Sequence, residues 1–383
     1  MNPVPPALSS LAGSQRVVVM GALASSLLNF RGPLIRALIG RGHVVFAVAP
    51  DIDEATAEAL RKLGAQPAAV RVRRASLNPL GALRTGLELR QLLRRVRADV
   101  MIAYTIKPVV LGAGAARATG VKRFVPLVTG LGYAFTEGRG LKRRISRLMA
   151  MRLYRRAFAR SAIAIFQNPD DRAEFQRLRL LPERLPAAVV NGSGVDLSVF
   201  RPAPLPDGPS FLMISRLLGD KGIREFAIAA RRLKQQHPQV RIGLVGYLDD
   251  TPDSIGADEL AAIVEGGVEF HGKLDDVRPA IAAYSVYVLP SYREGTPRSV
   301  LEALAIGRAI ITTDAPGCRE TVVDSHNGLL VPPRDPEALF EAMNFLVEHP
   351  DRIAAMAAAS RRIAEEKYDA DVVAANLLDY CGL

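Results

Sequence analysis

The sequence predicts an α/β protein with two doubly wound domains. Its 383 residues are more than one ordinary hydrophobic core accommodates. Short apolar runs alternate along the chain with helical patterns, which is typical of parallel sheets covered by helices. Residues 194–209 contain four prolines and two glycines, which interrupt any regular element. We therefore expect two similar domains that meet near residue 200.

The first domain is expected to comprise residues 1–200. Apolar runs of strand length predict buried parallel strands at 16–22, 43–50, 99–104, 123–128 and 162–166. Apolar residues at helical spacing predict helices at 31–41, 54–63, 80–97 and 140–160. Asp51 and Asp53 directly precede the second of these helices, so we interpret them as a helix start.

The second domain, expected to comprise residues 201–367, repeats this alternation. Strands are predicted at 211–215, 240–246, 268–272, 286–291, 309–314 and 328–332. Helices are predicted at 222–236, 256–265, 275–283, 297–306, 335–347 and 351–367. Residues 368–383 have the pattern of one more helix, which can pack back on the first domain. Ligands of open α/β sheets bind outside the carboxyl ends of the strands, so the site is expected in a cleft between the two domains.

Basic residues are concentrated in the first half of the chain. Residues 1–200 carry 31 Lys and Arg and 12 Asp and Glu, whereas residues 201–383 carry 19 and 27. This asymmetry indicates either an anionic partner, such as a membrane or a nucleic acid, or a solvated basic face.

The cysteines and the apolar runs indicate in which cellular compartment the protein is expected. Cys318 and Cys381 lie 63 positions apart without metal-ligand spacing, which is typical of free thiols in a reducing compartment. The first fifteen residues lack the basic start of a secretory signal, and the run from 17 to 28 is too short to span a bilayer. We expect a soluble or peripheral protein.

Two carboxylates lie in the segment REGTPRSVLEALAIG, residues 293–307. Glu294 and Glu302 have seven residues between them, and we expect Thr296 to cap a helix with Pro297 in its first turn. A helix N-terminus that follows a strand presents free N–H groups to an anion. The two carboxylates can therefore hold two hydroxyl-bearing parts of one extended ligand. The alternative is that each carboxylate pairs with a neighbouring basic residue.

A second loop adds cations to the same domain. Arg216 follows the strand predicted at 211–215, and Lys221 precedes the helix predicted at 222–236. An arginine fork and a compact lysine charge at the carboxyl end of a strand can clamp a diphosphate. Such a pair alone is typical of a protein surface. The helix with two glutamates, and the segment that contains Lys273, make the combination more specific.

The chain resembles the family 4 glycosyltransferases, which have the GT-B fold. Residues 291–339, SYREGTPRSVLEALAIGRAIITTDAPGCRETVVDSHNGLLVPPRDPEAL, are similar to the donor-site signature of that family along its whole length. Residues 34–50, 191–202 and 215–222 match other recurring segments of the family. The resemblance implies a GT-B architecture of two Rossmann-like domains that face an interdomain cleft, and transfer of a sugar from a nucleotide donor.

The resemblance also implies roles for individual residues. Arg216 and Lys221 are expected to bind the diphosphate of the nucleotide sugar. Glu302 is expected to hold the ribose hydroxyls, and Glu294 the transferred sugar, as a catalytic residue. The remaining expected donor-binding residues are Gly295, Thr296 and Lys273.

Segments of the first domain resemble bacterial enzymes that add a sugar to undecaprenyl-diphosphate-linked saccharides, above all the N-acetylgalactosaminyltransferases of N-glycan and O-antigen assembly. These segments are 29–43, 104–116 and 125–136. The resemblance implies a lipid-diphosphate-linked saccharide as acceptor. Many family members have a catalytic-site histidine in the loop after the strand at 99–104, but this chain has Thr105 and Lys107 there. We therefore take Lys107 as the candidate catalytic residue of the first domain. The alternative is that Lys107 is a solvated surface lysine.

The family implies that the anomeric configuration is retained. We expect a UDP-linked hexose or N-acetylhexosamine as donor. Arg216, Lys221 and helix N–H groups can stabilise the negative charge that develops on the leaving diphosphate. We therefore expect the site to need neither a metal ion nor another cofactor.

The pattern of residues 140–160 is that of a basic amphipathic helix. This stretch contains eight Lys and Arg residues and no acid, with apolar residues at roughly helical spacing. Such a helix suits an anionic membrane surface, and Arg143, Arg144 and Arg147 are the expected membrane or acceptor contacts. The protein is then expected in the cytoplasm, at the inner face of the cytoplasmic membrane. The alternative is a helix that packs on the sheet and turns its basic face to water.

Two other functions compete with glycosyl transfer. A GT-B sugar-nucleotide epimerase performs a different reaction on the same scaffold. A nucleic-acid-binding protein would fit the isoelectric point near 9.9. However, no recognisable nucleic-acid module is present, and the chain has no Trp for base stacking. We expect no nucleic-acid partner.

Overall fold

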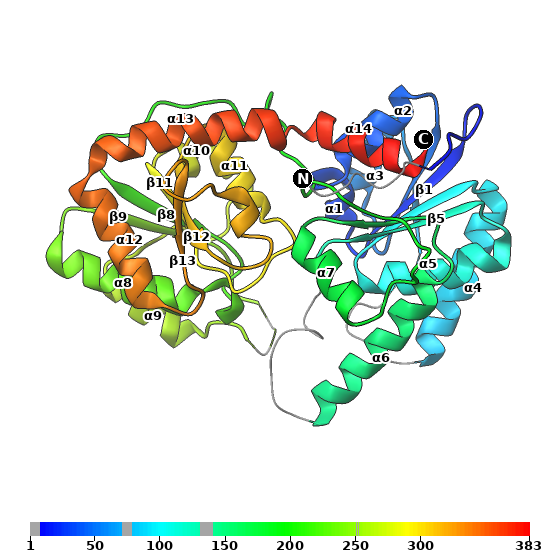
Figure 1. Cartoon of the computed structure of the whole chain (residues 1–383), viewed down its shortest axis with the longest axis horizontal. Coiled ribbons are helices and arrows are strands. Elements are labelled where there is room, and N and C mark those ends of the chain that lie inside the picture. Colours follow the sequence, from blue (N-terminus) through cyan, green and yellow to red (C-terminus); the bar gives the residue numbers. More distant parts are fainter. Residues whose placement is uncertain (1–7, 71–78, 131–140, 250, 252) are drawn as a thin grey trace. The chain divides into compact units, whose positions relative to one another are not determined.

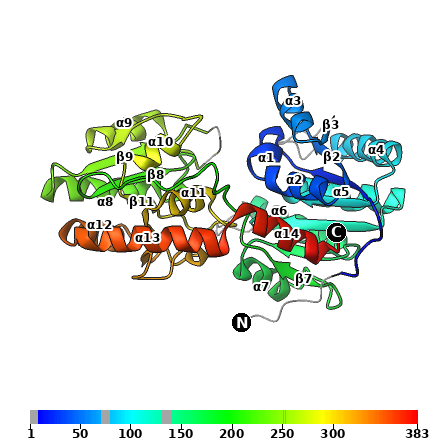
Figure 2. The same cartoon turned by 90° about the horizontal axis from the view of Figure 1, so that it is seen from above.

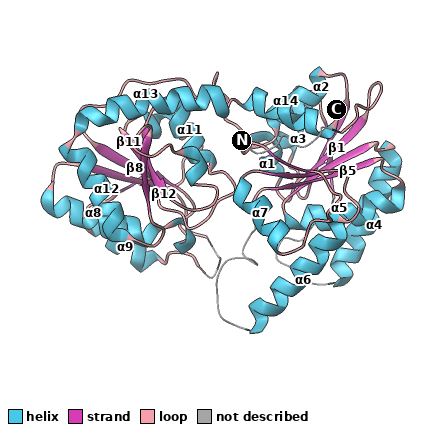
Figure 3. Ribbon diagram, in the orientation of Figure 1, coloured by secondary structure: helices cyan, strands magenta, loops and turns pink. Residues whose placement is uncertain are grey.

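The structure is a computed structural model that describes residues 8–70, 79–130, 141–249, 251 and 253–383 (Figure 1). The chain divides into two compact units, one formed by residues 1–193 and 370–383 and the other by residues 194–369. Each unit contains a parallel sheet covered by helices (Figure 3). The predicted fold class of two doubly wound α/β domains is confirmed.

In the described part of the first unit, seven parallel strands form one sheet in the order β3-β2-β1-β4-β5-β6-β7. Their bounds are β1 Arg16–Met20, β2 Val44–Ala49, β3 Gln66–Ala69, β4 Val100–Tyr104, β5 Arg123–Val128, β6 Ala164–Phe166 and β7 Ala187–Val189. The order reverses between β1 and β4, so the crevice of this sheet lies at the carboxyl ends of these two strands.

Helices cover both faces of this sheet, because neighbouring residues of a strand point to opposite faces. Val17 and Val19 of β1 pack in one apolar cluster, whereas Val18 and Met20 pack in another. The first cluster contains side chains from α1 Ala24–Asn29, α2 Gly32–Gly40, α3 Glu54–Lys62 and α14 Ala370–Cys381. The second contains side chains from α4 Pro79–Val96, α5 Ile106–Thr119, α6 Leu141–Phe158 and α7 Pro169–Arg177.

Two strands of this sheet were not predicted. β3 has the sequence QPAA and β7 the sequence AAV, so neither has the run of β-branched or aromatic residues that marks a strand. Both lie at the edges of the sheet, where short strands and a proline are tolerated. The helix start predicted at Asp53 is confirmed, because its carboxylate accepts a hydrogen bond from the backbone N–H of Thr56 at 2.7 Å.

In the second unit, the described residues form a six-stranded parallel sheet in the order β10-β9-β8-β11-β12-β13. The strands are β8 Ser210–Ile214, β9 Arg241–Val245, β10 Glu269–Phe270, β11 Val286–Leu289, β12 Ala309–Thr313 and β13 Gly328–Val331. The helices are α8 Ile223–Gln236, α9 Ala257–Glu265, α10 Arg278–Ala282, α11 Arg298–Ile306, α12 Pro336–Glu348 and α13 Pro350–Lys367. The order reverses between β8 and β11.

The chain enters and leaves the second unit at neighbouring points. The backbone N–H of Val195 donates to the carbonyl of Tyr368 at 2.8 Å, and Val195 pairs with Asp369 in a parallel bridge. The division between the units therefore lies at residue 193, a few residues before the boundary expected near 200. The last helix, α14, belongs to the first unit, where it packs against α2 (Figure 2).

Among the helices formed by the described residues, none combines the length and the low content of charged residues needed to cross a bilayer.

Candidate functional site

The predicted donor-site residues follow two adjacent strands of the second sheet. Arg216 lies two residues after β8, and Glu294 comes after β11. Because β8 and β11 flank the point at which the strand order reverses, their carboxyl ends border the crevice where such sheets bind ligands. The topology therefore brings together two segments that are separated by more than seventy positions in the sequence.

Lys221 and Glu294 form an ion pair at this crevice. The Nζ atom of Lys221 donates to Oε1 of Glu294 at 2.5 Å, and the two side chains are only 15% and 17% exposed. Burial disfavours the charged form of Lys221, but the Glu294 carboxylate and its hydrogen bond outweigh burial, so the pKa of Lys221 is raised. The lysine predicted to bind a diphosphate is thus a buried, charged group that contacts the catalytic candidate.

Two glycines permit the close packing that forms this pair. Lys221 ends a 3-10 turn, Gly219–Lys221, and Gly222 follows at φ +75° with its Cα against the carbonyl of Pro290 at the end of β11. Gly317, at φ +83°, packs against the carbonyl of Glu294 in the same manner. A Cβ at either glycine would overlap that backbone oxygen, so the two loops meet backbone to backbone.

We expect Gly222→Ala to lower the free energy of unfolding by more than about 2 kcal/mol, because alanine adds both left-handed strain and the overlap with Pro290. Gly208→Ala is the matched control, since Gly208 has φ +73° but no atom within 4 Å of a Cβ. Urea denaturation of both variants measures the difference. Equal losses for the two variants would show that the contact with Pro290 is unimportant.

Arg216 lies at the more exposed side of the same turn. Its guanidinium Nη1 is 3.2 Å from Oδ2 of Asp249, and its side chain is 46% exposed. The carboxylate of Asp253 accepts from the backbone N–H of Asp220 at 2.8 Å, and the carbonyl of Asp253 accepts from Gly219. These contacts hold the turn against the loop that follows β9. No local sequence motif marks this role of Asp249 and Asp253, so it was not predicted.

Glu302 is buried in α11 and has an arginine partner. Glu302 is only 8% exposed. Its Oε1 atom accepts a hydrogen bond from Nε of Arg298 at 2.7 Å. Burial raises the pKa of Glu302 although Arg298 opposes this. Burial also raises the pKa of Tyr287, and the nearby charges of Glu302 and Glu294 act in the same direction. The Tyr287 hydroxyl donates to the carbonyl of Ile214 at 2.9 Å, at the carboxyl end of β8.

The predicted start of α11 needs a correction. The N-cap residue is Pro297, not Thr296, and no side chain caps the helix. The Thr296 hydroxyl instead donates to the carbonyl of Gly295 at 2.9 Å, because the turn at 294–296 folds onto residues 316–317. At the other end of α11, Gly307 adopts φ +80° after the last turn, which is typical of a helix C-terminus.

Lys273 follows β10 in the same unit. It is exposed, and its ammonium lies 5.9 Å from the centroid of the Tyr247 ring, within cation–π range. The backbone N–H of Leu217 donates to the carbonyl of Tyr247. Lys273 therefore lies over the residue that supports the loop containing Arg216 and Lys221.

The candidate residue of the first unit, Lys107, lies in the first turn of α5 at the carboxyl end of β4. It is partly buried, and burial lowers its pKa. Thr105 precedes the helix at φ +67°, a strained value for a β-branched residue. Neighbouring residues that the sequence analysis missed include Arg31, which is 3% exposed and stacks over Tyr104 at 4.7 Å.

Helix α6 combines a buried aromatic face with an exposed basic one. Tyr154 and Phe158 are buried and stack with each other at 5.6 Å between ring centroids. Leu148 and Met149 are 54% and 49% exposed beside the exposed Arg147. The side chains of Arg143 and Arg144, the other two predicted contacts, lie outside the described residues.

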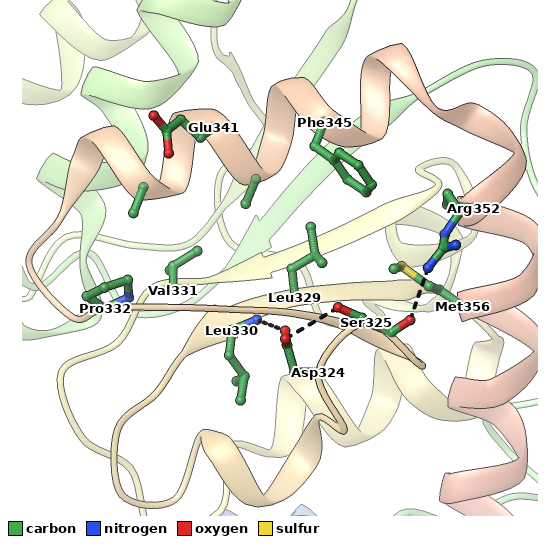
Figure 4. Close-up of a pocket in the computed structure, with 12 residues that line it drawn as sticks. Asp324, Ser325, Leu329, Leu330, Val331, Pro332, Glu341, Phe345, Arg352 and Met356 are labelled. Carbon is green, nitrogen blue, oxygen red and sulfur yellow. Dashed lines mark hydrogen bonds between the residues drawn. The ribbon is translucent and has the colours of Figure 1, made fainter.

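A separate hollow of about 430 Å³ lies against β13, α12 and α13 (Figure 4). Leu329, Phe345 and Met356 form its apolar part, and Arg352 donates to the carbonyl of Ser325 at its rim. None of the predicted donor-site residues lines this hollow.

Comparisons with known proteins identify relatives of this chain. Residues 31–192 match the model of a glycosyl transferase 4-like domain, and residues 208–349 match that of glycosyl transferases group 1. The chain is 32% identical over 347 residues to the N,N'-diacetylbacillosaminyl-diphospho-undecaprenol alpha-1,3-N-acetylgalactosaminyltransferase of Campylobacter jejuni, covering 87% of this chain and 89% of that protein.

Two solved structures show the same fold. Sucrose-phosphate synthase from Thermosynechococcus elongatus superimposes with a TM-score of 0.79 at 18% identity, covering 95% of this chain and 97% of that one. Anabaena Alr3699/HepE, solved in complex with UDP, superimposes with a TM-score of 0.76 at 19% identity over 96% of this chain and 99% of that one. The architecture is therefore GT-B, and the chain belongs to family 4 of the glycosyltransferases.

Proposed function

We propose that this glycosyltransferase transfers a hexose or N-acetylhexosamine, with retention, from a UDP-linked donor to a lipid-diphosphate-linked saccharide during assembly of a bacterial surface polysaccharide or glycan. The Campylobacter relative carries a diphospho-undecaprenol substrate in its name, which supports the lipid-linked acceptor. The UDP complex of HepE supports the choice of nucleotide. The observation that carries the proposal is the meeting of Arg216, Lys221 and Glu294 at the switch point of the second sheet.

In this proposal the two cations bind the donor diphosphate. Lys221 is buried, and Arg216 lies five residues before it in the loop that joins β8 to α8, so one loop supplies both cations. As the glycosidic bond breaks, the leaving diphosphate gains negative charge that these cations stabilise. A metal ion is then not required for this stabilisation, and no other cofactor takes part.

Retention is proposed to follow from attack on the same face that the diphosphate leaves. The bond from the anomeric carbon to the diphosphate oxygen breaks, and the acceptor hydroxyl oxygen forms the new bond. The leaving phosphate oxygen takes the proton of that hydroxyl. Glu294 holds the transferred sugar during this step, and Glu302 holds the ribose. In the first unit, Lys107 is the candidate to contact the acceptor.

The test is incubation of the protein with UDP- and GDP-linked sugars and lipid-diphosphate-linked acceptors, read by the mass of the products. The proposal expects an acceptor extended by one sugar residue in the presence of a UDP-sugar. Conversion of the donor to an epimer without acceptor would instead identify a sugar-nucleotide epimerase. Extension with only GDP-sugars would overturn the choice of UDP.

We also propose that α6 contacts the anionic inner face of the cytoplasmic membrane. A lipid-linked acceptor requires the enzyme to reach the bilayer. Exposed Leu148 and Met149 beside exposed Arg147 provide apolar insertion and charge attraction on one helix. Tyr154 packs edge-on against Phe175 of α7 and Phe158 stacks with Phe166 of β6, which supports a helix that is anchored to the first unit by its C-terminal half.

Reversing Arg143, Arg144 and Arg147 to Glu is expected to release the protein from anionic liposomes, most clearly at low salt, where surface charges are least screened. Co-sedimentation at several salt concentrations measures the effect. The control reverses three exposed arginines of the second unit, Arg201, Arg231 and Arg362, and should retain binding. Persistent binding of the α6 variant would indicate that the membrane contact lies elsewhere.

A further inference from the structure

The ion pair between Lys221 and Glu294 joins two groups that the proposed function assigns to different parts of the donor. Lys221 is assigned to the diphosphate and Glu294 to the sugar. The Glu294 carboxylate competes strongly with a diphosphate for the charge of Lys221. Its Oε1 atom lies 2.5 Å from Nζ, and both side chains are largely buried. A diphosphate that approaches Lys221 meets an ammonium whose charge is already compensated.

The surroundings of Lys221 reinforce this compensation. Asp220 adds a second carboxylate whose charge acts on Lys221, and its Oδ1 atom is buried without a hydrogen-bond partner among the described residues. Arg216 adds one further positive charge nearby. The set formed by these four side chains is close to neutral, and Asp249, which pairs with Arg216 at 3.2 Å, adds one more carboxylate beside it. A diphosphate gains full attraction from this set only if one carboxylate is drawn away.

The main chain at Glu294 is not free to withdraw. Its N–H donates to the carbonyl of Pro316 at 2.9 Å, and its own carbonyl is packed against Gly317. Lys221 is fixed in the same way by the contact of Gly222 with Pro290. Any exchange of partners must therefore occur by side-chain rotation, with both backbones in place.

We infer that Glu294 makes the site discriminate between a nucleotide that carries a sugar and the same nucleotide without one, because it is the displaceable counterion of Lys221. This inference rests on the proposed function. The hydroxyl groups of a donor sugar give Glu294 new hydrogen-bond partners, and Lys221 is released to the diphosphate. A bare nucleoside diphosphate offers no such partners, so Glu294 stays on Lys221 and repels the phosphates.

The same exchange weakens the binding of the product. Once the sugar has left, Glu294 returns to Lys221 and competes with the nucleoside diphosphate. If Lys221 is available to a bare diphosphate for about a tenth of the time, the apparent affinity falls about tenfold. The ion pair then promotes product release at the end of each cycle.

Calorimetric titration with UDP and with GDP tests the inference. Glu294→Gln keeps the shape of the side chain but removes its charge, so it is expected to bind the nucleotide roughly three- to tenfold more tightly than the wild-type protein. Glu294→Ala serves as a second variant and should show a gain in the same direction. In a Lys221→Ala background, Glu294→Gln should give no gain, because the group that it releases is missing.

Glu365→Gln is the charge-matched control, since Glu365 pairs with Arg361 at 2.6 Å in α13 of the same unit. It should leave nucleotide affinity unchanged, which excludes a general effect of net charge. Equal or weaker binding by folded Glu294→Gln and Glu294→Ala, with normal binding by the wild-type protein, would overturn the inference alone. Failure of the wild-type protein and of both Glu294 variants to bind UDP or GDP would overturn the proposed donor site, and this inference with it.

Discussion

Lys221→Ala is expected to remove at least about 2 kcal/mol of transition-state stabilisation, which corresponds to a loss of roughly 30-fold or more in kcat/KM. Lys221 is the buried cation of the crevice, where a charge–charge interaction is stronger than at the surface. Its removal also leaves Glu294 and Asp220 facing the donor diphosphate without their shared cation. Both effects disfavour the charge that develops on the leaving group.

The rate is measured by initial velocities at low donor concentration, with circular dichroism to show that the variant is folded. Lys62→Ala provides the control, because Lys62 is an exposed lysine that pairs with Glu58 in the first unit. It should retain the wild-type kcat/KM. An unchanged kcat/KM for folded Lys221→Ala would refute the assignment of this lysine to the diphosphate.

The strands and helices of the fold were largely predictable because burial on both faces of a parallel sheet demands continuous apolar runs. β1 and β4 show this pattern and were expected near their observed positions. The edge strands β3 and β7 were missed, since pairing on one side only permits short segments such as QPAA. In the first sheet, local sequence therefore predicts the central strands better than the edge strands, whereas in the second sheet the edge strands β10 and β13 were predicted as well.

Contacts between distant segments of the chain could not be predicted from local sequence patterns. Arg308, only 1% exposed, donates hydrogen bonds to the carbonyls of Ala203, Pro204, Ile281 and Ala282. Nothing in the surrounding sequence distinguishes this buried arginine from a surface one. The turn that contains Thr296 also has a distant partner, since residues 316–317 pack on it.

The residues of the candidate site were proposed from the sequence, but the pairing of Lys221 with Glu294 was not. The motif indicated that Arg216, Lys221, Glu294 and Glu302 belong to one donor site. It did not indicate that Lys221 bonds to Glu294, because the spacing of residues along the chain contains no information on which side chains meet. The backbone contacts of Gly222 and Gly317 supply that information.

Glu294→Gln and Glu302→Ala are expected to affect different steps of the reaction. Glu294→Gln preserves hydrogen bonding to the transferred sugar but removes the negative charge that stabilises an oxocarbenium-like transition state. It should lower kcat by about 100-fold, the scale of losing one oriented electrostatic contact, without weakening UDP binding. Glu302→Ala removes the buried carboxylate assigned to the ribose, and it should weaken UDP binding by roughly tenfold or more, as expected for a charged hydrogen bond.

One calorimetric titration with UDP and one rate assay separate the two carboxylates, because UDP contains the ribose and lacks the sugar. Glu302 pairs with Arg298, so Arg298→Ala controls for the loss of that ion pair and should weaken UDP binding less than Glu302→Ala. The opposite pattern is loss of UDP affinity in Glu294→Gln with normal affinity in Glu302→Ala. It would mean that α11 presents its residues to the donor in the reverse order, with the ribose at Glu294 and the sugar at Glu302.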